Sequence, residues 1–217
     1  MLHRRPILAV WVVTLLMAGA SAAEEGSRFG VKAGVQTLTS PVTGGKTTRT
    51  RLELEFSTAR LLDGHVDLAL ALGGSSLGTL RDASMTEEDG LFTDASSIDD
   101  LCVLDLRLAA HYYPLGQDDR GLTPYLGAGL GYFLFIDTWQ DTVFAWETDP
   151  FAIVTYTITG RTDTVAEGFF TFLMAGLTVS LGEHAELLAE VAYDFSKQDR
   201  GHDLGGPIYL IGGRYRW

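Results

Sequence analysis

The sequence holds very little cysteine. Cys102 is the only one among 217 residues. A single thiol cannot form an internal disulfide, and no Cys and His residues stand at the spacing of a zinc site. We therefore expect a fold that relies neither on a disulfide framework nor on a metal or other cofactor.

Basic residues are scarce as well. Lys and Arg together number 16 against 28 Asp and Glu, and the formal net charge is −12. Nucleic-acid binding depends on Lys and Arg that neutralise phosphates. An acidic chain of this kind is therefore not expected to have a nucleic-acid partner.

Long apolar runs are missing beyond residue 23. The longest uncharged stretches, residues 122–136 and 168–182, are interrupted by Gly, Thr or Pro. A membrane-spanning helix needs about 20 predominantly apolar residues. The pattern therefore excludes spanning helices in the main part of the chain.

The first residues are typical of a cleaved export signal. Arg4 and Arg5 precede an apolar stretch over residues 7–17, and small residues fill positions 18–23. This order matches a secretory signal peptide, whereas a retained anchor would not need small residues at that point. We predict a signal peptide over 1–23 and a mature domain over 24–217. Removal of the signal peptide takes the net charge to −14, because the peptide contains Arg4 and Arg5 and no acidic residue.

What the mature chain does have is alternation with a period of two. Apolar residues alternate with small or polar ones in eight segments, at residues 29–36, 51–56, 66–72, 104–112, 124–136, 171–180, 186–195 and 209–217. Such alternation predicts strands. The connections are alternately long and short, with long ones at 37–47, 74–100, 137–167 and 196–206. Long loops at one rim and short turns at the other are typical of membrane barrels. We predict an all-β fold, an eight-stranded antiparallel up-and-down transmembrane β-barrel.

The two faces of the predicted strands differ in charge. One face is almost free of charge, which suits contact with lipid, and the other combines glycines with side chains of both signs. We predict that this second face lines the lumen and forms a structural ion network of Lys32, Arg51, Glu53, Glu55, Asp67, Asp105, Arg107, Glu190, Asp194, Arg214 and Arg216. Buried charges need partners, and we expect Lys32 beside Glu53 and Glu55, and Arg214 beside Glu190. A soluble barrel with the opposite orientation and an ion path through the lumen are the alternatives.

Two further segments resemble a known family. Residues 124–132, Pro-Tyr-Leu-Gly-Ala-Gly-Leu-Gly-Tyr, follow His-Tyr-Tyr-Pro at 111–114. Together they resemble the central hairpin of small outer-membrane barrels of the OmpA, OmpX and OmpW type. The C-terminus resembles the strand that the barrel-assembly machinery reads, with Gly212, Tyr215 and Trp217 at the matching positions and Leu210 where a polar residue is usual. The resemblance implies a Gram-negative outer-membrane location, with outer-membrane lipid, lipopolysaccharide and the assembly machinery as partners.

The two longest connections are the candidates for contact with a surface ligand. Residues 74–100 are strongly acidic, which predicts a solvated loop or, as an alternative, a site for a divalent cation. Residues 137–167 are aromatic and rich in β-forming residues. They predict either a hairpin that extends beyond the membrane or a plug over the barrel mouth.

The sequence predicts no catalytic site. Asp194, Ser196, His202 and Asp203 could supply a Ser-His-Asp set, as in barrel enzymes that modify lipid A, but their spacing is arbitrary. We therefore expect a non-enzymatic outer-membrane protein that acts structurally or through its outer loops. A narrow, porin-like conduit for small or hydrophobic solutes and a lipid A-modifying enzyme are the alternatives.

Overall fold

The structure is a computed structural model of the 217-residue chain. It describes residues 26–39, 45–58, 61–88, 91–116, 121–147, 153–195, 197–199 and 202–217. The predicted signal peptide lies outside these residues. The strands are β1 Arg28–Thr39, β2 Lys46–Ser57, β3 Val66–Glu88, β4 Leu91–Tyr112, β5 Leu122–Glu147, β6 Ile153–Ser180, β7 Ala185–Phe195, β8 Gln198–Asp199, β9 His202–Asp203 and β10 Gly206–Arg216.

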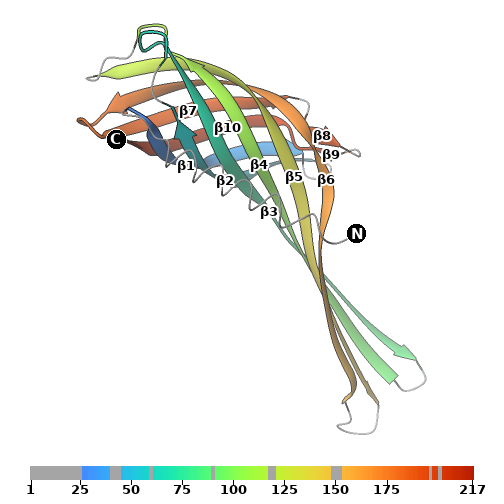
Figure 1. The fold of residues 1–217 in the computed structure, drawn as a ribbon. Coiled ribbons are helices and arrows are strands. Elements are labelled where there is room, and N and C mark those ends of the chain that lie inside the picture. The colour runs from blue at the N-terminus through green and yellow to red at the C-terminus, as the bar shows by residue number, and fades with distance from the viewer. Residues whose placement is uncertain are drawn as a thin grey trace, which may run out of the picture.

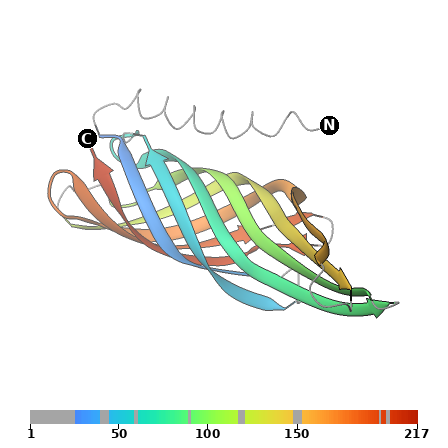
Figure 2. The same cartoon turned by 90° about the horizontal axis from the view of Figure 1, so that it is seen from below.

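Eight of these strands form a closed antiparallel barrel (Figures 1 and 2). The order around the ring is β1-β10-β7-β6-β5-β4-β3-β2, and β1 closes it by pairing with β10 from Arg28↔Arg216 to Gln36↔Ile208. Closure leaves no strand edge inside the barrel, which is the condition for a sheet to survive in hydrocarbon. The predicted eight-stranded up-and-down barrel is confirmed.

The strands are oriented with their apolar rows outward. Leu70, Leu108 and Leu130 lie side by side on three neighbouring strands, and Leu108 and Leu130 are 57% and 62% exposed. The alternate residues, such as Asp105 and Arg107, are buried inside. A soluble barrel would have the reverse arrangement. The structure therefore contradicts the soluble alternative.

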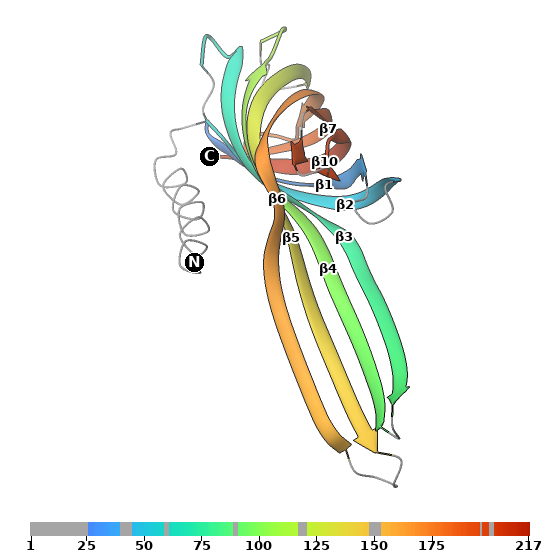
Figure 3. The ribbon, with the colours of Figure 1, turned by 90° about the vertical axis from the view of Figure 1, so that its right-hand side faces the viewer.

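Two of the long outer connections are paired strands, which confirms the hairpin alternative for residues 137–167 and shows that the loop predicted at 74–100 was wrong. β3 and β4 stay paired from Val66↔Tyr112 to Glu88↔Leu91, and β5 and β6 from Leu122↔Val179 to Trp146↔Ile153. The acidic 74–100 and aromatic 137–167 connections thus continue the barrel strands as two long hairpins. The pairing of β4 with β5 joins them into one four-stranded sheet. We call this projection the fin; it comprises residues 79–88, 91–100, 138–147 and 153–162 (Figure 3).

The opposite rim has short turns and holds both ends of the described barrel. The β6–β7 turn passes through Gly182, whose φ of 107° is a conformation that a side chain would strain. Gly26 N donates a hydrogen bond to Trp217 O there, at 2.6 Å. The fin and the chain ends therefore lie on opposite sides of the barrel. No helix within the described part of the chain is long and apolar enough to cross a membrane.

An arginine on the outer row tests the orientation. Leu108→Arg places a charge in the middle of the lipid-facing row, and we expect it to lower the unfolding free energy in bilayers by about 2–4 kcal/mol. Thr157→Arg, on the exposed fin, is the control, with an expected change of about 0.5 kcal/mol or less. Urea unfolding of the two variants in vesicles measures the difference, and equal costs would contradict the orientation.

Candidate functional site

The lumen is filled by charged side chains in three successive layers. The layer nearest the chain ends is built around Asp67, which is fully buried. Its carboxylate lies 3.3 Å from the Arg28 guanidinium and 2.8 Å from His111 Nδ1, and it accepts a hydrogen bond of 2.8 Å from Tyr113. Arg28 also contacts Glu186 at 3.1 Å. One carboxylate therefore joins side chains from β1 and from the end of β4.

The middle layer is centred on Lys32, which has no exposed surface. Its ammonium group lies 3.0 Å from Glu53, 2.5 Å from Glu55 and 3.0 Å from Glu190. Glu190 also accepts a hydrogen bond of 2.7 Å from the Tyr125 hydroxyl. A lysine ammonium has three donors, and here each is directed to a different carboxylate.

The upper layer connects arginines and aspartates across the barrel. Arg51 donates to both oxygens of Asp105, at 2.6 and 2.9 Å, in a bidentate pair. Arg107 contacts Asp105 at 2.9 Å and Asp194 at 2.8 Å. Glu53 links this layer to the middle one, because its other oxygen lies 2.9 Å from Arg51. The three layers therefore fill the lumen with paired charges.

Two glycines allow these pairs to form across an intervening strand. Gly73 of β3 lies in register between β2 and β4, and a Cβ built on it would lie 1.9 Å from the Arg51 guanidinium. Gly30 of β1 plays the same part for Arg214, since its Cβ would lie 2.9 Å from Arg214 Cγ. Each arginine crosses the backbone of a glycine to reach a carboxylate two strands away.

Arg214 consequently has a partner other than the predicted one. The sequence analysis places it beside Glu190, on the neighbouring strand β7. In the structure Arg214 crosses Gly30 and lies 2.6 Å from Glu55, whereas Glu190 contacts Lys32. The predicted pair was wrong because the prediction assumed that Arg214 contacts the adjacent strand. Gly30 has no side chain, so Arg214 can extend across β1 to Glu55.

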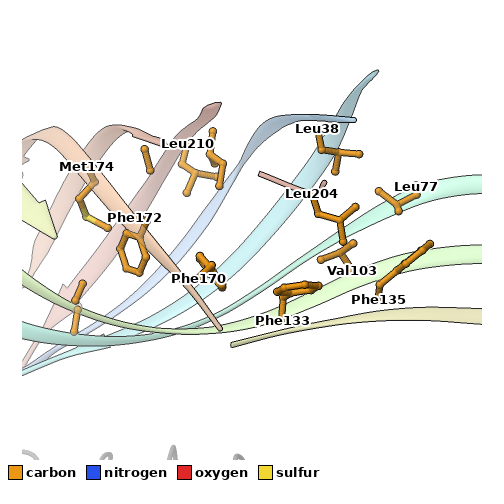
Figure 4. Close-up of a cluster of buried hydrophobic side chains, with 14 of the residues drawn as sticks. Leu38, Leu77, Val103, Phe133, Phe135, Phe170, Phe172, Met174, Leu204 and Leu210 are labelled. Atoms are coloured by element: carbon orange, nitrogen blue, oxygen red, sulfur yellow. The ribbon is translucent and has the colours of Figure 1, made fainter. Parts of the chain in front are cut away.

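The mouth of the barrel is closed by the last outer connection. We call residues 197–205 the plug; positions 200 and 201 lie outside the described residues. Lys197 is fully buried, 2.7 Å from Asp105 and 3.3 Å from Asp194, and its ammonium group lies 4.6 Å from the centre of the Phe170 ring. Leu204 is also fully buried, among apolar residues of the mouth (Figure 4).

This apolar cap separates the ion network from the outside. It consists of side chains from four barrel strands and the plug, namely Leu38, Leu77, Val103, Phe133, Phe135 and Leu204, all at most 7% exposed (Figure 4). The sequence analysis named residues 137–167 as one candidate for a plug. The structure assigns that place to the shorter 197–205 segment, while most of 137–167 extends away as part of the fin.

Ten of the eleven predicted network residues face the lumen, and the eleventh lies at the rim. Arg216 is half-buried, and its guanidinium donates two hydrogen bonds, of 2.9 and 2.7 Å, to the carbonyl of Glu183 in the β6–β7 turn. Arg216 is near the end of β10, where the lumen opens. Among the residues of the predicted assembly signal, Gly212 packs against the Val31 carbonyl, and the Tyr215 and Trp217 rings stack at 6.3 Å. Their role in assembly remains a prediction.

Of the four residues considered for catalysis, the structure describes the side chains of Asp194 and Asp203 and not that of His202. Asp194 is buried in the upper layer, where its carboxylate contacts Arg107 and Lys197. Asp203 accepts a hydrogen bond from the Gly205 backbone N–H at 3.0 Å. Ser196 lies outside the described residues. Within those residues, no three His, Cys, Asp or Glu side chains gather as a metal site.

Sequence reasoning missed three members of the network. Arg28 and Glu186 share the parity of the predicted lumen residues on their strands, so the alternation contained the signal that could have found them. Lys197 lies in a connection, where no periodicity applies. Its position follows from the inward fold of the plug, which the sequence pattern does not show.

The glycine crossing at Gly73 gives a sharp test of the network. Gly73→Ala removes no contact directly, yet its methyl group would occupy the place of the Arg51 guanidinium. We expect the unfolding free energy to fall by about 3 kcal/mol, because Asp105 loses its bidentate partner in a buried setting. Gly213→Ala is the matched control. Its nearest contact would be 3.7 Å, so an ordinary strand alanine fits there. Denaturant unfolding measures the unfolding free energy of both variants. An equal loss in the two would contradict the crossing of Arg51 over Gly73.

Proteins similar to this chain are found among the solved structures. No protein-family model matches the chain, and no curated protein matches it. Among solved structures, Neisserial surface protein A from Neisseria is similar with a TM-score of 0.54 and 11% identity, covering 89% of this chain and 98% of that one. The outer membrane protein OprG from Pseudomonas aeruginosa has a TM-score of 0.47 and 14% identity over 90% of this chain and 98% of its own.

The likeness to Neisserial surface protein A extends over nearly the whole of both chains. At this level of identity it concerns the fold. It agrees with the closed ring of eight strands described above. The chain therefore has the fold of the small eight-stranded outer-membrane β-barrels.

Proposed function

We propose that this protein is a non-enzymatic outer-membrane barrel that holds the fin at the cell surface, where the fin contacts other molecules. The observation that carries this proposal is the division of the molecule into two parts. The barrel has an apolar exterior and a lumen closed by paired charges, whereas the fin extends the same strands far beyond the ring (Figure 3).

The composition of the fin supports a position in water. On the described fin residues, hydroxyl side chains recur on both faces of the sheet. Thr157 and Thr159 are exposed on one face, and Ile158 is 51% exposed on the other. A lipid-facing strand would have a continuous apolar face. The fin therefore fits an aqueous location, and the short turns fit the opposite side of the membrane.

The closed lumen argues against transport. Lys32, Arg51 and Lys197 each have no exposed surface. Lys32 lies in the middle layer, and Arg51 and Lys197 both contact Asp105 in the upper layer. An eight-stranded barrel has an interior just wide enough for side chains to fill. A conduit would require layers of buried ion pairs to separate, which is costly. We therefore favour a structural barrel over a narrow solute channel.

The proposed topology is tested by labelling intact cells. In a Cys102→Ser background, Ile158→Cys places a thiol on the fin and Leu181→Cys places one on an exposed short turn. We expect a membrane-impermeant maleimide to label only the fin thiol in intact cells and both thiols after permeabilisation. Labelling of the turn in intact cells, or protection of the fin, would contradict the proposal. Heat-modifiable migration of the membrane fraction checks that each variant is folded.

Conductance separates the structural role from the conduit alternative. Purified protein in a planar bilayer is expected to show no steady open state. The Lys197→Ala variant should behave in the same way, because Arg51 and Arg107 still fill the level beneath the plug. A steady conductance of the unaltered protein would support the conduit. A conductance that appears only in the variant would show that the plug alone seals the lumen.

A further inference from the structure

The fin has two open edges. Pairing of β2 with β3 ends at Arg51↔Ser75, and pairing of β6 with β7 begins at Thr171↔Phe195. Beyond these points the β3 edge, residues 79–88, and the β6 edge, residues 155–161, each have one neighbouring strand among the described residues (Figure 3). The outer side of such a strand presents backbone N–H and C=O groups to which another strand can pair.

Neither edge contains the strongest features that prevent such pairing. Proteins protect edge strands with proline, bulges or charged side chains, lysine above all. The β3 edge has the sequence Thr-Leu-Arg-Asp-Ala-Ser-Met-Thr-Glu-Glu, and the β6 edge has Thr-Tyr-Thr-Ile-Thr-Gly-Arg. Neither contains proline or lysine, and the bulges between Ser76 and Gly78 on β3 and beside Thr155 on β6 lie outside the two segments. The four charged residues of the β3 edge restrict which strand it can accept.

The directions of the two edges select the partner. A sheet of four antiparallel strands has edges that run in opposite directions, so β3 leads away from the barrel and β6 returns to it. We propose that the fin pairs with the fin of a second copy in the same membrane. A two-fold axis along the membrane normal then places the β3 edge of each copy antiparallel to the β6 edge of the other. The eight strands of the two fins form one closed ring.

Charge favours the same choice. The β3 edge carries Asp82, Glu87 and Glu88 against one arginine, Arg81. The charge on the β6 edge is Arg161, which forms an ion pair of 2.6 Å with Asp163 just beyond the edge. Pairing β3 with its own copy would bring acidic segments together. Under a two-fold axis along the membrane normal it would also be parallel, which is less stable per residue. Pairing of β3 with β6 avoids this repulsion, because residues 155–161 contain no acidic side chain.

The register of the fin shows which positions lie at equal height. Asp82, Ser97, Asp141 and Thr159 form one row across the four strands. The adjacent row joins Ala83 with Ile158 through Ser96 and Thr142. A closed ring requires the register to be staggered around it. Across each seam a row therefore meets residues a few positions along the partner's edge, and each residue of stagger moves a position by about 3.3 Å.

Cross-linking between two singly substituted chains tests the pairing. Ala83→Cys and Ile158→Cys, each in a Cys102→Ser background, are exposed positions on opposite edges. A bismaleimide with a flexible spacer tolerates a stagger of a few residues across the seam. We expect cells that contain both variants to give cross-linked dimers at a yield at least about tenfold above cells that contain either variant alone. Strong cross-linking of a single variant, or none in the mixture, would overturn the proposal.

A matched pair of charge variants tests the edge chemistry. Thr159 is exposed and lies in the row of Asp82. In the dimer, the Thr159→Glu side chain of each copy faces the acidic β3 edge of the other copy. This substitution should reduce the cross-linked fraction by roughly tenfold, because like charges across strands repel. Thr159→Lys should preserve it or raise it. An equal loss in both variants would overturn the charge argument.

This inference rests on the membrane insertion proposed above, and the two can fail separately. Heat-modifiable migration and fractionation report insertion for every variant. A chain that is found outside the membrane would refute the proposed function. A chain that is inserted, folded and labelled at the fin but never cross-linked would refute only the pairing of two fins.

Discussion

The structure depends on the mutual neutralisation of charges within a narrow lumen. Six basic side chains, Arg28, Lys32, Arg51, Arg107, Lys197 and Arg214, lie among seven carboxylates, Glu53, Glu55, Asp67, Asp105, Glu186, Glu190 and Asp194, and all are at most 4% exposed. A buried charge without a partner is strongly destabilising. Each strand must therefore take its correct place before its neighbours are satisfied, so the network fixes the register of the ring as well as filling it.

Glycine makes that network possible. Eight strands leave little room inside, and an arginine that reaches only its nearest neighbours would leave carboxylates on the far strands unmatched. Gly30 and Gly73 remove a side chain at the crossing points, and Gly129 and Gly131 make room for the rings of Phe172 and Phe170. In each case a small residue on one strand admits a large one from another. The lumen is thus filled by complementary sizes as much as by complementary charges.

Periodicity made the ring, the orientation of its faces and most of the network predictable. Lys32, Glu53 and Asp105 each lie at the alternate positions of their strand that are polar. In a strand this alternation decides whether a side chain faces the lumen. The pairing of Arg214 with Glu55 was not predictable from adjacency, because it spans a strand. The burial of Lys197 was not predictable either, because a connection has no period. The acidic fin strands within 74–100 were predicted as a loop, because hydrophobic alternation ends where both faces meet water, whereas the β-forming residues of 137–167 predicted a hairpin.

The same strand geometry explains why the molecule has a closed part and an open part. Within hydrocarbon, unpaired backbone groups are too costly, so every strand there has two neighbours. Beyond the membrane that constraint ends, and among the described residues β3, β4, β5 and β6 are the strands that continue. They are consecutive in the ring, so they remain one sheet, and their even number gives edges of opposite direction. The barrel closes upon itself, whereas the fin keeps the capacity to pair, and a partner of identical sequence satisfies both of its edges at once.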